Sequence, residues 1–377
     1  YDLKQEQVVR LTEGEWNVQD ITCVNENDNR VYFHGSPENS TEKHLLCLDM
    51  NDRNLSDLTS DPGSHQAMVS PKGSFIIDSY SSITHPEKMV LAAVNGEVIR
   101  ELGNRESEKM DSYNFGTVQL FKVPAGDGIS LPAMWVLPPQ RVTGQKFPVI
   151  ISVYGGPGSQ DVKNSYVSLH DNFYAQNGII IFRVDHRGTA HFGKVGAKEM
   201  HRQLGKWEMH DLIAAVKWLR EQPFVDAEKI GIRGTSYGGY VAALALTRGA
   251  EYFTYGFSGF PVTDWRLYDS MYTERYMDMP DENPQGYEDA SVMNYVEEYN
   301  GHLQISHGGV DDNVHVQNTM QLADALLAHL KNFELLIYPN QFHGYRGNYR
   351  RHSQRNEVDF WFRHFFNREF ELVHEGS

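Results

Sequence analysis

One stretch in the second half of the chain has the residue types and spacing of a serine nucleophile. Gly234, Ser236 and Gly238 form a Gly-x-Ser-x-Gly pattern, preceded by the apolar run 230–232 and followed by small residues over 237–246. A strand, a sharp turn and a helix in this order hold a serine hydroxyl exposed, and the glycines let strand and helix approach closely. The pattern predicts that Ser236 is a nucleophile; the alternative is a glycine-rich turn without chemistry.

A serine hydroxyl becomes a good nucleophile when a histidine takes its proton and a carboxylate orients that histidine. Candidates for both roles follow Ser236 in the order that such hydrolases use. Asp311 and Asp312 come shortly after a short apolar run, and His343 comes after the next run, directly before a glycine. We expect Ser236, His343 and one of the two aspartates to meet, and spacing alone does not decide between Asp311 and Asp312.

Acyl transfer also needs hydrogen-bond donors for the oxyanion of the tetrahedral intermediate. The backbone N–H of Tyr237, the residue after the serine, is one expected donor. The second would come from the loop 153–158, which reads Val-Tyr-Gly-Gly-Pro-Gly, and the hydroxyl of Tyr154 is a candidate there. Packing of Tyr154 against the end of a strand is an equal alternative.

The elements that must position these residues begin at about residue 113, where strands and helices start to alternate. A hairpin is expected at 117–123 and 131–137. Buried parallel strands are expected at 147–154, 179–184, 229–233, 255–260, 303–307 and 333–338, and helices at 208–222, 237–248 and 316–330. The alternation predicts a doubly wound α/β sheet, in which sites gather at the carboxyl ends of the strands.

The first 110 or so residues have a different texture, with short β-like runs separated by polar turns at 20–24, 30–34, 45–48, 75–79 and 89–93. Leu-Thr at 11–12 recurs at 58–59, and Glu-Lys at 42–43 recurs at 87–88. A repeat of about 45 residues is typical of four-stranded propeller blades. Two blades cannot close a propeller, so further blades would precede Tyr1; a small β-sandwich is the alternative. The polar stretch 105–111 resembles a linker, which predicts a partial propeller over 1–112 and a catalytic domain over 113–377.

Composition excludes several classes of function. The 377 residues carry a formal net charge of −16, which argues against nucleic acid and anionic membrane surfaces as partners. The two cysteines, Cys23 and Cys47, have no metal-ligand spacing, so we expect free thiols and neither metal nor other cofactor. The sequence has neither an apolar run of about 18 residues nor a signal segment, so any anchor or export signal would have been removed. We expect a periplasmic or extracellular protein.

Five motifs closely resemble those of the dipeptidyl peptidase IV-like branch of the prolyl oligopeptidase family. They are Tyr154-Gly155-Gly156-Pro157 with Ser159-Gln160, Asp185-His186-Arg187-Gly188, the stretch 234–240, Tyr268-Asp269-Ser270-Met271-Tyr272-Thr273-Glu274-Arg275-Tyr276-Met277, and Asp311-Asp312-Asn313-Val314-His315. The resemblance is dense from about residue 113 to the end and looser before it. It implies an α/β-hydrolase domain, with a doubly wound, mostly parallel sheet, preceded by the last blades of an eight-bladed β-propeller.

The resemblance also assigns roles to residues. It implies a triad of Ser236, Asp311 and His343, with Tyr154 and Tyr237 as oxyanion donors. It places a proline pocket at Tyr237, Val262, Trp265, Tyr268, Tyr272 and Val314, with Asn313 hydrogen bonding to a substrate carbonyl. An aromatic box suits the flat, apolar ring of proline. The implied function is a serine exopeptidase that releases Xaa-Pro or Xaa-Ala dipeptides from peptides through an acyl-enzyme.

One feature of the family is not found in this sequence. Its members hold the substrate's free amino terminus with two glutamates and an arginine near a propeller segment, whereas Glu297-Glu298 lies in the hydrolase part, where we expect a solvated helix pair. The sequence therefore resembles a C-terminal portion whose amine-anchoring acids would lie upstream. Alternatives are another prolyl oligopeptidase-family endopeptidase, an acylaminoacyl peptidase, an esterase, or a catalytically inactive binding homologue.

The C-terminal stretch 356–372 has an aromatic face at helical spacing, formed by Val358, Trp361, Phe362 and Phe365. Most of this face should belong to the core. In the resembling family this helix also contributes to a dimer interface, so a homodimer is possible through the same helix.

Overall fold

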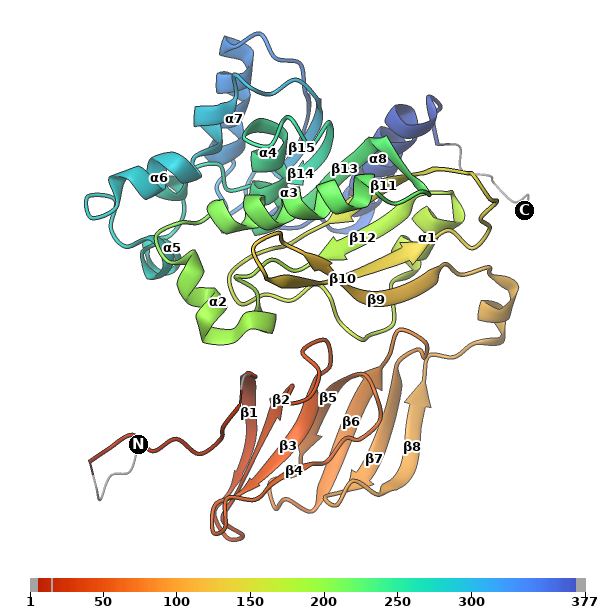
Figure 1. Cartoon of the computed structure of the whole chain (residues 1–377), viewed down its shortest axis with the longest axis vertical. Helices are drawn as coiled ribbons and strands as arrows, with labels where there is room; N and C mark the ends of the chain where they lie inside the picture. Colours follow the sequence, from red (N-terminus) through yellow and green to blue (C-terminus); the bar gives the residue numbers. More distant parts are fainter. Residues whose placement is uncertain (1–5, 15, 371–377) are drawn as a thin grey trace.

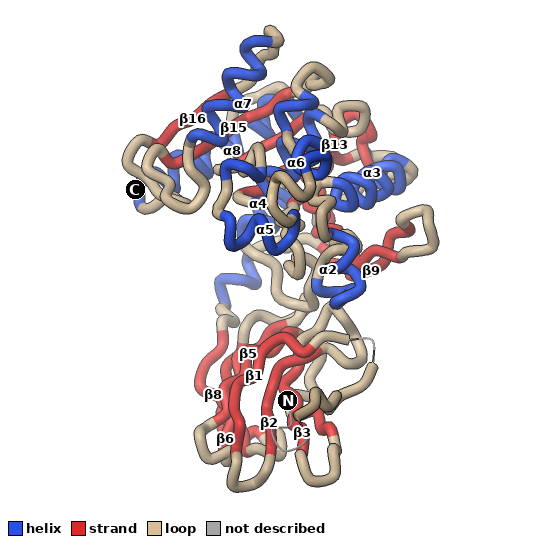
Figure 2. Tube along the Cα trace, turned by 90° about the vertical axis from the view of Figure 1, so that its left-hand side faces the viewer, coloured by secondary structure: helices blue, strands red, loops and turns tan. Residues whose placement is uncertain are grey.

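The computed structural model describes residues 6–14 and 16–370, which form three sheets. Two four-stranded antiparallel sheets lie side by side on one side of an α/β part that contains the third sheet (Figures 1 and 2). The first small sheet contains β1 (Val18–Asn25), β2 (Arg30–Gly35), β3 (His44–Asp49) and β4 (Leu55–Asp57), and the second contains β5 (Ser64–Val69), β6 (Phe75–Ser81), β7 (Lys88–Ala93) and β8 (Val98–Asn104). Each sheet runs in sequence order, which is the pattern of a propeller blade.

The two blades share one small core. Tyr32 and Leu45 from the first sheet and Ile76 and Ala92 from the second are buried in a common cluster. Cys47 is buried in the same cluster and Cys23 packs against it, and both are free thiols. The expected strands of this region are confirmed, whereas β4, β5 and β8 were not expected.

A short helical turn, η1 (Glu108–Ser112), separates the blades from the α/β part. Its first turn is capped by Ser107, whose side chain accepts a hydrogen bond from the backbone N–H of Lys109. We propose a domain boundary between residues 112 and 113, because η1 belongs to neither the last blade nor the next sheet.

The α/β part is built on an eight-stranded, mostly parallel sheet. Its strands are β9 (Thr117–Pro124), β10 (Ser130–Leu137), β11 (Phe147–Ser152), β12 (Ile180–Val184), β13 (Val225–Thr235), β14 (Tyr255–Gly259), β15 (His302–Gly308) and β16 (Glu334–Tyr338). The spatial order is β16-β15-β14-β13-β11-β12-β10-β9. β9 and β10 form the expected hairpin, β10 also pairs antiparallel with β12, and the remaining pairs are parallel.

Helices cover both faces of this sheet. The α/β part has two hydrophobic cores, one on each face of the sheet. The larger core includes α3 (Lys206–Arg220) and α4 (Tyr237–Thr247), and the smaller core includes α1 (Leu169–Gln176) and α8 (Gly347–Phe366). The remaining helices are α2 (Gly193–Met200), α5 (Ser270–Met277), α6 (Pro284–Ala290) and α7 (Gln317–Ala328), with helical turns η2 (Ala190–Phe192), η3 (Trp265–Leu267) and η4 (Val292–Tyr295). The fold is an α/β-hydrolase fold preceded by propeller blades, as expected.

Two expectations about the later elements need correction. The C-terminal helix begins at Gly347, earlier than expected, because its first turns are polar and lack an apolar period; it ends at Phe366, and residues 371–372 lie outside the described residues. The aromatic side chains that were expected to form its core face are all buried. Glu297 and Glu298 are exposed as expected, but they lie in a turn rather than in a helix.

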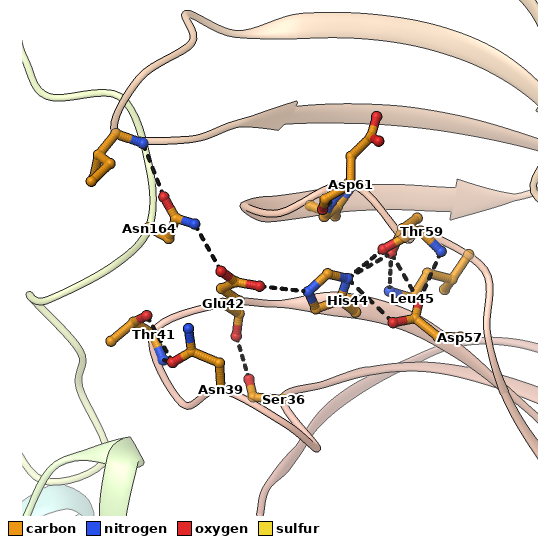
Figure 3. A network of polar contacts seen from close by, with 12 residues as sticks. Ser36, Asn39, Thr41, Glu42, His44, Leu45, Asp57, Thr59, Asp61 and Asn164 are labelled. Atoms are coloured by element: carbon orange, nitrogen blue, oxygen red, sulfur yellow. Dashed lines mark hydrogen bonds and ion pairs between the residues drawn. The ribbon is translucent and has the colours of Figure 1, made fainter. Parts of the chain in front are cut away.

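The blades contact the hydrolase through the loop after β11 and through residues 190–191 after β12. Asn164 lies at the centre of this contact (Figure 3): its Nδ2 donates to Glu42 Oε1 at 2.8 Å, and its Oδ1 accepts from the backbone N–H of Ile83 at 3.0 Å. The backbone N–H of Asn164 also donates to the carbonyl of Thr41 at 2.7 Å. One asparagine therefore joins the loop to both blades.

The part of the chain that the structure describes has neither a candidate membrane span nor a candidate metal site. None of the helices in the described residues has the length and apolarity needed to cross a bilayer. Nor do the same residues contain a group of three or more His, Cys, Asp or Glu side chains arranged to hold a metal ion.

Candidate active site

Ser236 occupies the sharp turn between β13 and α4. Its backbone has φ 58° and ψ −120°, a strained conformation for a residue with a side chain. The backbone N–H of Ser236 donates to the carbonyl of Gly259 at 2.9 Å, which ties the turn to the end of β14. This geometry is that of a nucleophile elbow, which raises the serine hydroxyl above the carboxyl end of the sheet.

The glycines around this turn are required by close backbone approach. A Cβ at Gly238 would collide with the carbonyl oxygen of Val153, and a Cβ at Gly239 would collide with that of Gly259. All residues of α4 are buried. The helix can therefore lie directly on the sheet only because its first turn carries no side chain at these two positions.

Three side chains meet at this end of the sheet. His343, which follows β16, has its Nε2 at 2.9 Å from Ser236 Oγ and its Nδ1 at 2.8 Å from Asp311 Oδ2. Asp311 follows β15 and is buried, whereas the neighbouring Asp312 is exposed. The structure thus brings Asp311, and not Asp312, to His343. The serine hydroxyl can donate to Nε2 while the Nδ1–H donates to the carboxylate.

The carboxylate of Asp311 is surrounded by hydrogen-bond donors. Its Oδ1 accepts from the backbone N–H groups of Asn313 and Val314, both at 3.0 Å. Its Oδ2 contacts His343 and also Nε2 of His307 at 3.3 Å. Burial alone would raise the pKa of this carboxyl, but the hydrogen bonds from His307 and His343 outweigh burial and hold the pKa well below its usual value. Asp311 is therefore ionised.

His307 is a supporting residue that sequence reasoning missed. It is fully buried, with Nδ1 at 2.7 Å from Thr319 Oγ1 and Nε2 at 2.8 Å from the carbonyl of Val314. These contacts hold the histidine against the carboxylate oxygen of Asp311 that also contacts His343. Its position at the end of β15, one turn before Asp311, was the available signal.

Tyr154 and Tyr237 are the two candidate oxyanion donors. Tyr237 is the first residue of α4, where the backbone N–H is not used by the helix's own hydrogen bonds. Tyr154 follows β11, and its ring centroid lies 6.1 Å from that of Tyr237. Burial raises the pKa of Tyr154, and so does the nearby charge of Asp161, so the phenol is neutral at ordinary pH. The Tyr154 hydroxyl is therefore a candidate oxyanion donor.

A series of hydrogen bonds holds the loop that carries Tyr154. The backbone N–H of Tyr154 donates to Asp161 Oδ2 at 2.7 Å, and the backbone N–H of Asp161 donates to the buried carboxylate of Asp185. His191 bridges Asp185, at 2.9 Å, and Ser40 of the first blade, at 2.8 Å. Burial and the charge of Asp185 raise the pKa of Asp161. Tyr154 is therefore positioned before any substrate binds.

Aromatic side chains line the space beside Tyr237. The ring centroid of Trp265 lies 5.3 Å from Tyr237 and 6.0 Å from both Tyr268 and Tyr272, and the rings of Tyr268 and Tyr272 meet at 5.4 Å. The hydroxyl of Tyr268 donates to Asn313 Oδ1 at 2.9 Å. Two valines of the expected pocket, Val262 and Val314, are buried in the same core cluster. Tyr237, Trp265, Tyr268, Tyr272 and Asn313 are therefore linked by direct contacts, and Val314 donates its backbone N–H to Asp311.

Both parts of the chain are similar to known protein families. The model of the prolyl oligopeptidase family matches residues 165–368, and that of the dipeptidyl peptidase IV N-terminal region matches residues 1–87. Two fungal proteins named probable dipeptidyl-aminopeptidase B are similar: the one from Talaromyces marneffei is 35% identical over 89% of this chain, and the one from Aspergillus terreus is 32% identical over 97%.

A solved structure is similar over nearly the whole chain. The crystal structure of Porphyromonas gingivalis dipeptidyl peptidase 4 has a TM-score of 0.92 and 32% sequence identity over 96% of this chain. The chain spans 52% of that protein and only 38% and 41% of the two fungal relatives.

Proposed function

This chain belongs to the prolyl oligopeptidase family, and on that basis we propose that it supplies the catalytic domain of a dipeptidyl peptidase that uses Ser236 as its nucleophile. The main support for the proposal is a pair of hydrogen bonds that connects Asp311 to His343 and His343 to Ser236. Ser236 lies beside an aromatic pocket and two candidate oxyanion donors. Nucleophile, base, orienting carboxylate and oxyanion donors are the parts that acyl transfer requires.

The proposed reaction proceeds through an ester on Ser236. The hydroxyl oxygen attacks the carbonyl carbon of the scissile peptide bond while His343 Nε2 takes the hydroxyl proton. The carbonyl oxygen becomes an oxyanion, which accepts hydrogen bonds from the Tyr237 N–H and the Tyr154 hydroxyl. The C–N bond then breaks as His343 returns the proton to the leaving amine. Water, activated by His343, hydrolyses the ester and releases the dipeptide.

We propose that the residue before the scissile bond is proline or alanine. A pocket bounded by the rings of Trp265, Tyr268 and Tyr272 fits a flat, apolar ring and has little room for a longer side chain. Because Asn313 Oδ1 accepts from Tyr268, its amide nitrogen is the group that would donate to a substrate carbonyl.

Cleavage of short peptides of matched sequence tests this proposal. We expect the full-length protein, whose upstream part would supply the amine-anchoring acids, to release Gly-Pro and Gly-Ala from peptides with a free amino terminus, as identified by mass spectrometry, and its Ser236→Ala variant to release neither. Release of single residues, equal cleavage of N-acetylated peptides, or cleavage inside the peptide would overturn the dipeptidyl assignment in favour of another activity of the family. Absence of hydrolysis by the folded full-length protein would favour an inactive homologue.

Two further proposals rest on the family resemblance alone. The first is a homodimer that uses α8, and the second is a location in the periplasm or outside the cell. Sedimentation of the purified protein tests the first, and fractionation of the producing cells tests the second.

A further inference from the structure

Glu208, in the first turn of α3, is a buried carboxylate with no role in the reaction just described. Its side chain is fully buried, and its Oε1 accepts a hydrogen bond from the backbone N–H of Gly205 at 2.9 Å. The same oxygen accepts from the hydroxyl of Tyr237 at 2.5 Å. Its other oxygen, Oε2, is buried and has no hydrogen-bond partner among the described residues. The contact with Tyr237 connects α3 to the first residue of α4.

The capping of α3 explains only one of these contacts. The Glu208 carboxylate accepts from the backbone N–H of Gly205, which is half of a capping box, and the positive end of the helix favours a negative charge at this position. A cap can be made at the surface, however, whereas a buried carboxylate with one unpartnered oxygen is costly. The bond to Tyr237 is not part of the cap, and it is the contact that requires Glu208 to be buried.

Two parts of Tyr237 must stay in place, its backbone N–H and its ring. Its backbone N–H lies next to the nucleophile, and its ring forms one wall of the aromatic pocket, with Trp265 at 5.3 Å and Tyr240 at 5.5 Å. A hydroxyl bonded to a carboxylate makes a short and strong hydrogen bond. Burial, followed by the charge of Glu208, raises the pKa of Tyr237 well above its usual value, so the phenol remains a donor. The ring is thus fixed at its far end.

We propose that Glu208 is a positioning residue that fixes the ring of Tyr237 and thereby limits the side chain that the pocket accepts. Without the bond the ring can move away from Trp265, and the pocket then admits a residue larger than proline. The inference rests on the proposed function, because the pocket is assigned to the residue before the scissile bond.

Four variants separate this role from the capping of α3. Tyr237→Phe removes the hydroxyl and keeps the cap, and Glu208→Ala removes both the bond and the cap. Glu208→Gln keeps an oxygen acceptor and a residue that suits the capping box. Tyr240→Phe is the matched control, because Tyr240 packs on the same tryptophan at 5.2 Å, but its buried hydroxyl meets no partner at normal hydrogen-bond geometry among the described residues.

The first measurement is the ratio of kcat/KM for Gly-Pro to that for Gly-Leu chromogenic substrates. We expect Tyr237→Phe and Glu208→Ala each to lower this ratio about tenfold, a typical effect of a change in pocket size. The double variant should lower it no further, because both changes break one interaction. Glu208→Gln and Tyr240→Phe should stay close to the wild type. An unchanged ratio in Tyr237→Phe and Glu208→Ala, with only the melting temperature reduced in the latter, would leave Glu208 as a cap and overturn the proposal.

The second measurement does not depend on turnover. Hydrogen exchange of the segment 234–240 should be faster in Glu208→Ala and Tyr237→Phe than in the wild type, and unchanged in Tyr240→Phe. If the wild-type protein cleaves neither substrate, the proposed function fails, and exchange still decides the positioning role. Equal exchange in all variants would overturn it.

Discussion

At the residue scale, Tyr154 has the most specific chemical role to test. Its phenol stays neutral at ordinary pH, and its backbone N–H is held by Asp161. Tyr154→Phe keeps the ring and removes only the proposed donor. We expect kcat to fall by roughly 10²- to 10³-fold, the usual result of losing one oxyanion donor, with KM nearly unchanged. Steady-state kinetics on a Gly-Pro substrate measures this, and an unchanged kcat would leave Tyr154 with a packing role only.

The lowered pKa of Asp311 predicts how the free energy of unfolding depends on pH. Because the pKa of its carboxyl is lower in the folded protein, its ionised form stabilises the fold above the unfolded pKa of about 4, and this contribution is lost as pH falls through the folded value. Asp311→Asn removes the titration. The difference in the free energy of unfolding between wild type and variant should therefore be largest near neutral pH and shrink below about pH 4.

Urea unfolding of both proteins at several pH values between 7 and 3 provides the measurement. Asn54→Ala, at an exposed asparagine in the first blade, serves as a control whose difference from the wild type should not change with pH. A difference for Asp311→Asn that is the same at every pH would contradict a lowered pKa.

At the element scale, the packing of α4 on the sheet positions the nucleophile. A Cβ at Gly239 would collide with the carbonyl of Gly259, the same carbonyl that accepts from the backbone N–H of Ser236. We expect Gly239→Ala to lower the free energy of unfolding by about 1–3 kcal/mol, as overpacking does, and to lower kcat as well. Denaturant unfolding and kinetics of the same preparation measure both effects.

Gly103 offers the matched control for this substitution. It lies on the exposed strand β8, and an added Cβ there would meet nothing within 4 Å. Gly103→Ala should change stability by no more than about 0.5 kcal/mol. Equal effects of the two substitutions would show that close approach at Gly239 is not what holds the turn.

The elements that could be predicted from the sequence are those whose residues are buried on both sides. β11 and β12 are nearly continuous apolar runs and β13 to β16 contain shorter ones, and the order of these runs predicted that Ser236, Asp311 and His343 meet at one edge of the sheet. β8 could not be predicted because all its residues are exposed, and α6 because it has only seven residues and begins at a proline. Glu208 was missed because a glutamate in the first turn of an amphipathic helix looks like an ordinary cap.

At the scale of the whole molecule, the contact between blades and hydrolase depends on few side chains. Asn164 is largely buried and bonds to Glu42 and to the backbone of Ile83, one in each blade (Figure 3). Asn164→Ala removes the hydrogen-bond partner of the half-buried Ile83 N–H, a loss of about 1 kcal/mol. We expect faster hydrogen exchange over the contact segments 36–43 and 81–86 than in the wild type or in Asn54→Ala. Equal exchange in all three proteins would mean that Asn164 does not hold the two parts together.

The central claim is that Ser236 is a nucleophile activated by His343 and Asp311. Its most direct test is reaction of the purified protein with a fluorophosphonate, followed by mapping of the adduct by mass spectrometry. We predict one adduct, on the peptide that contains Ser236, lost in Ser236→Ala and much slower to form in His343→Ala. A folded protein that forms no adduct, or an adduct on another serine that persists in Ser236→Ala, would contradict the claim.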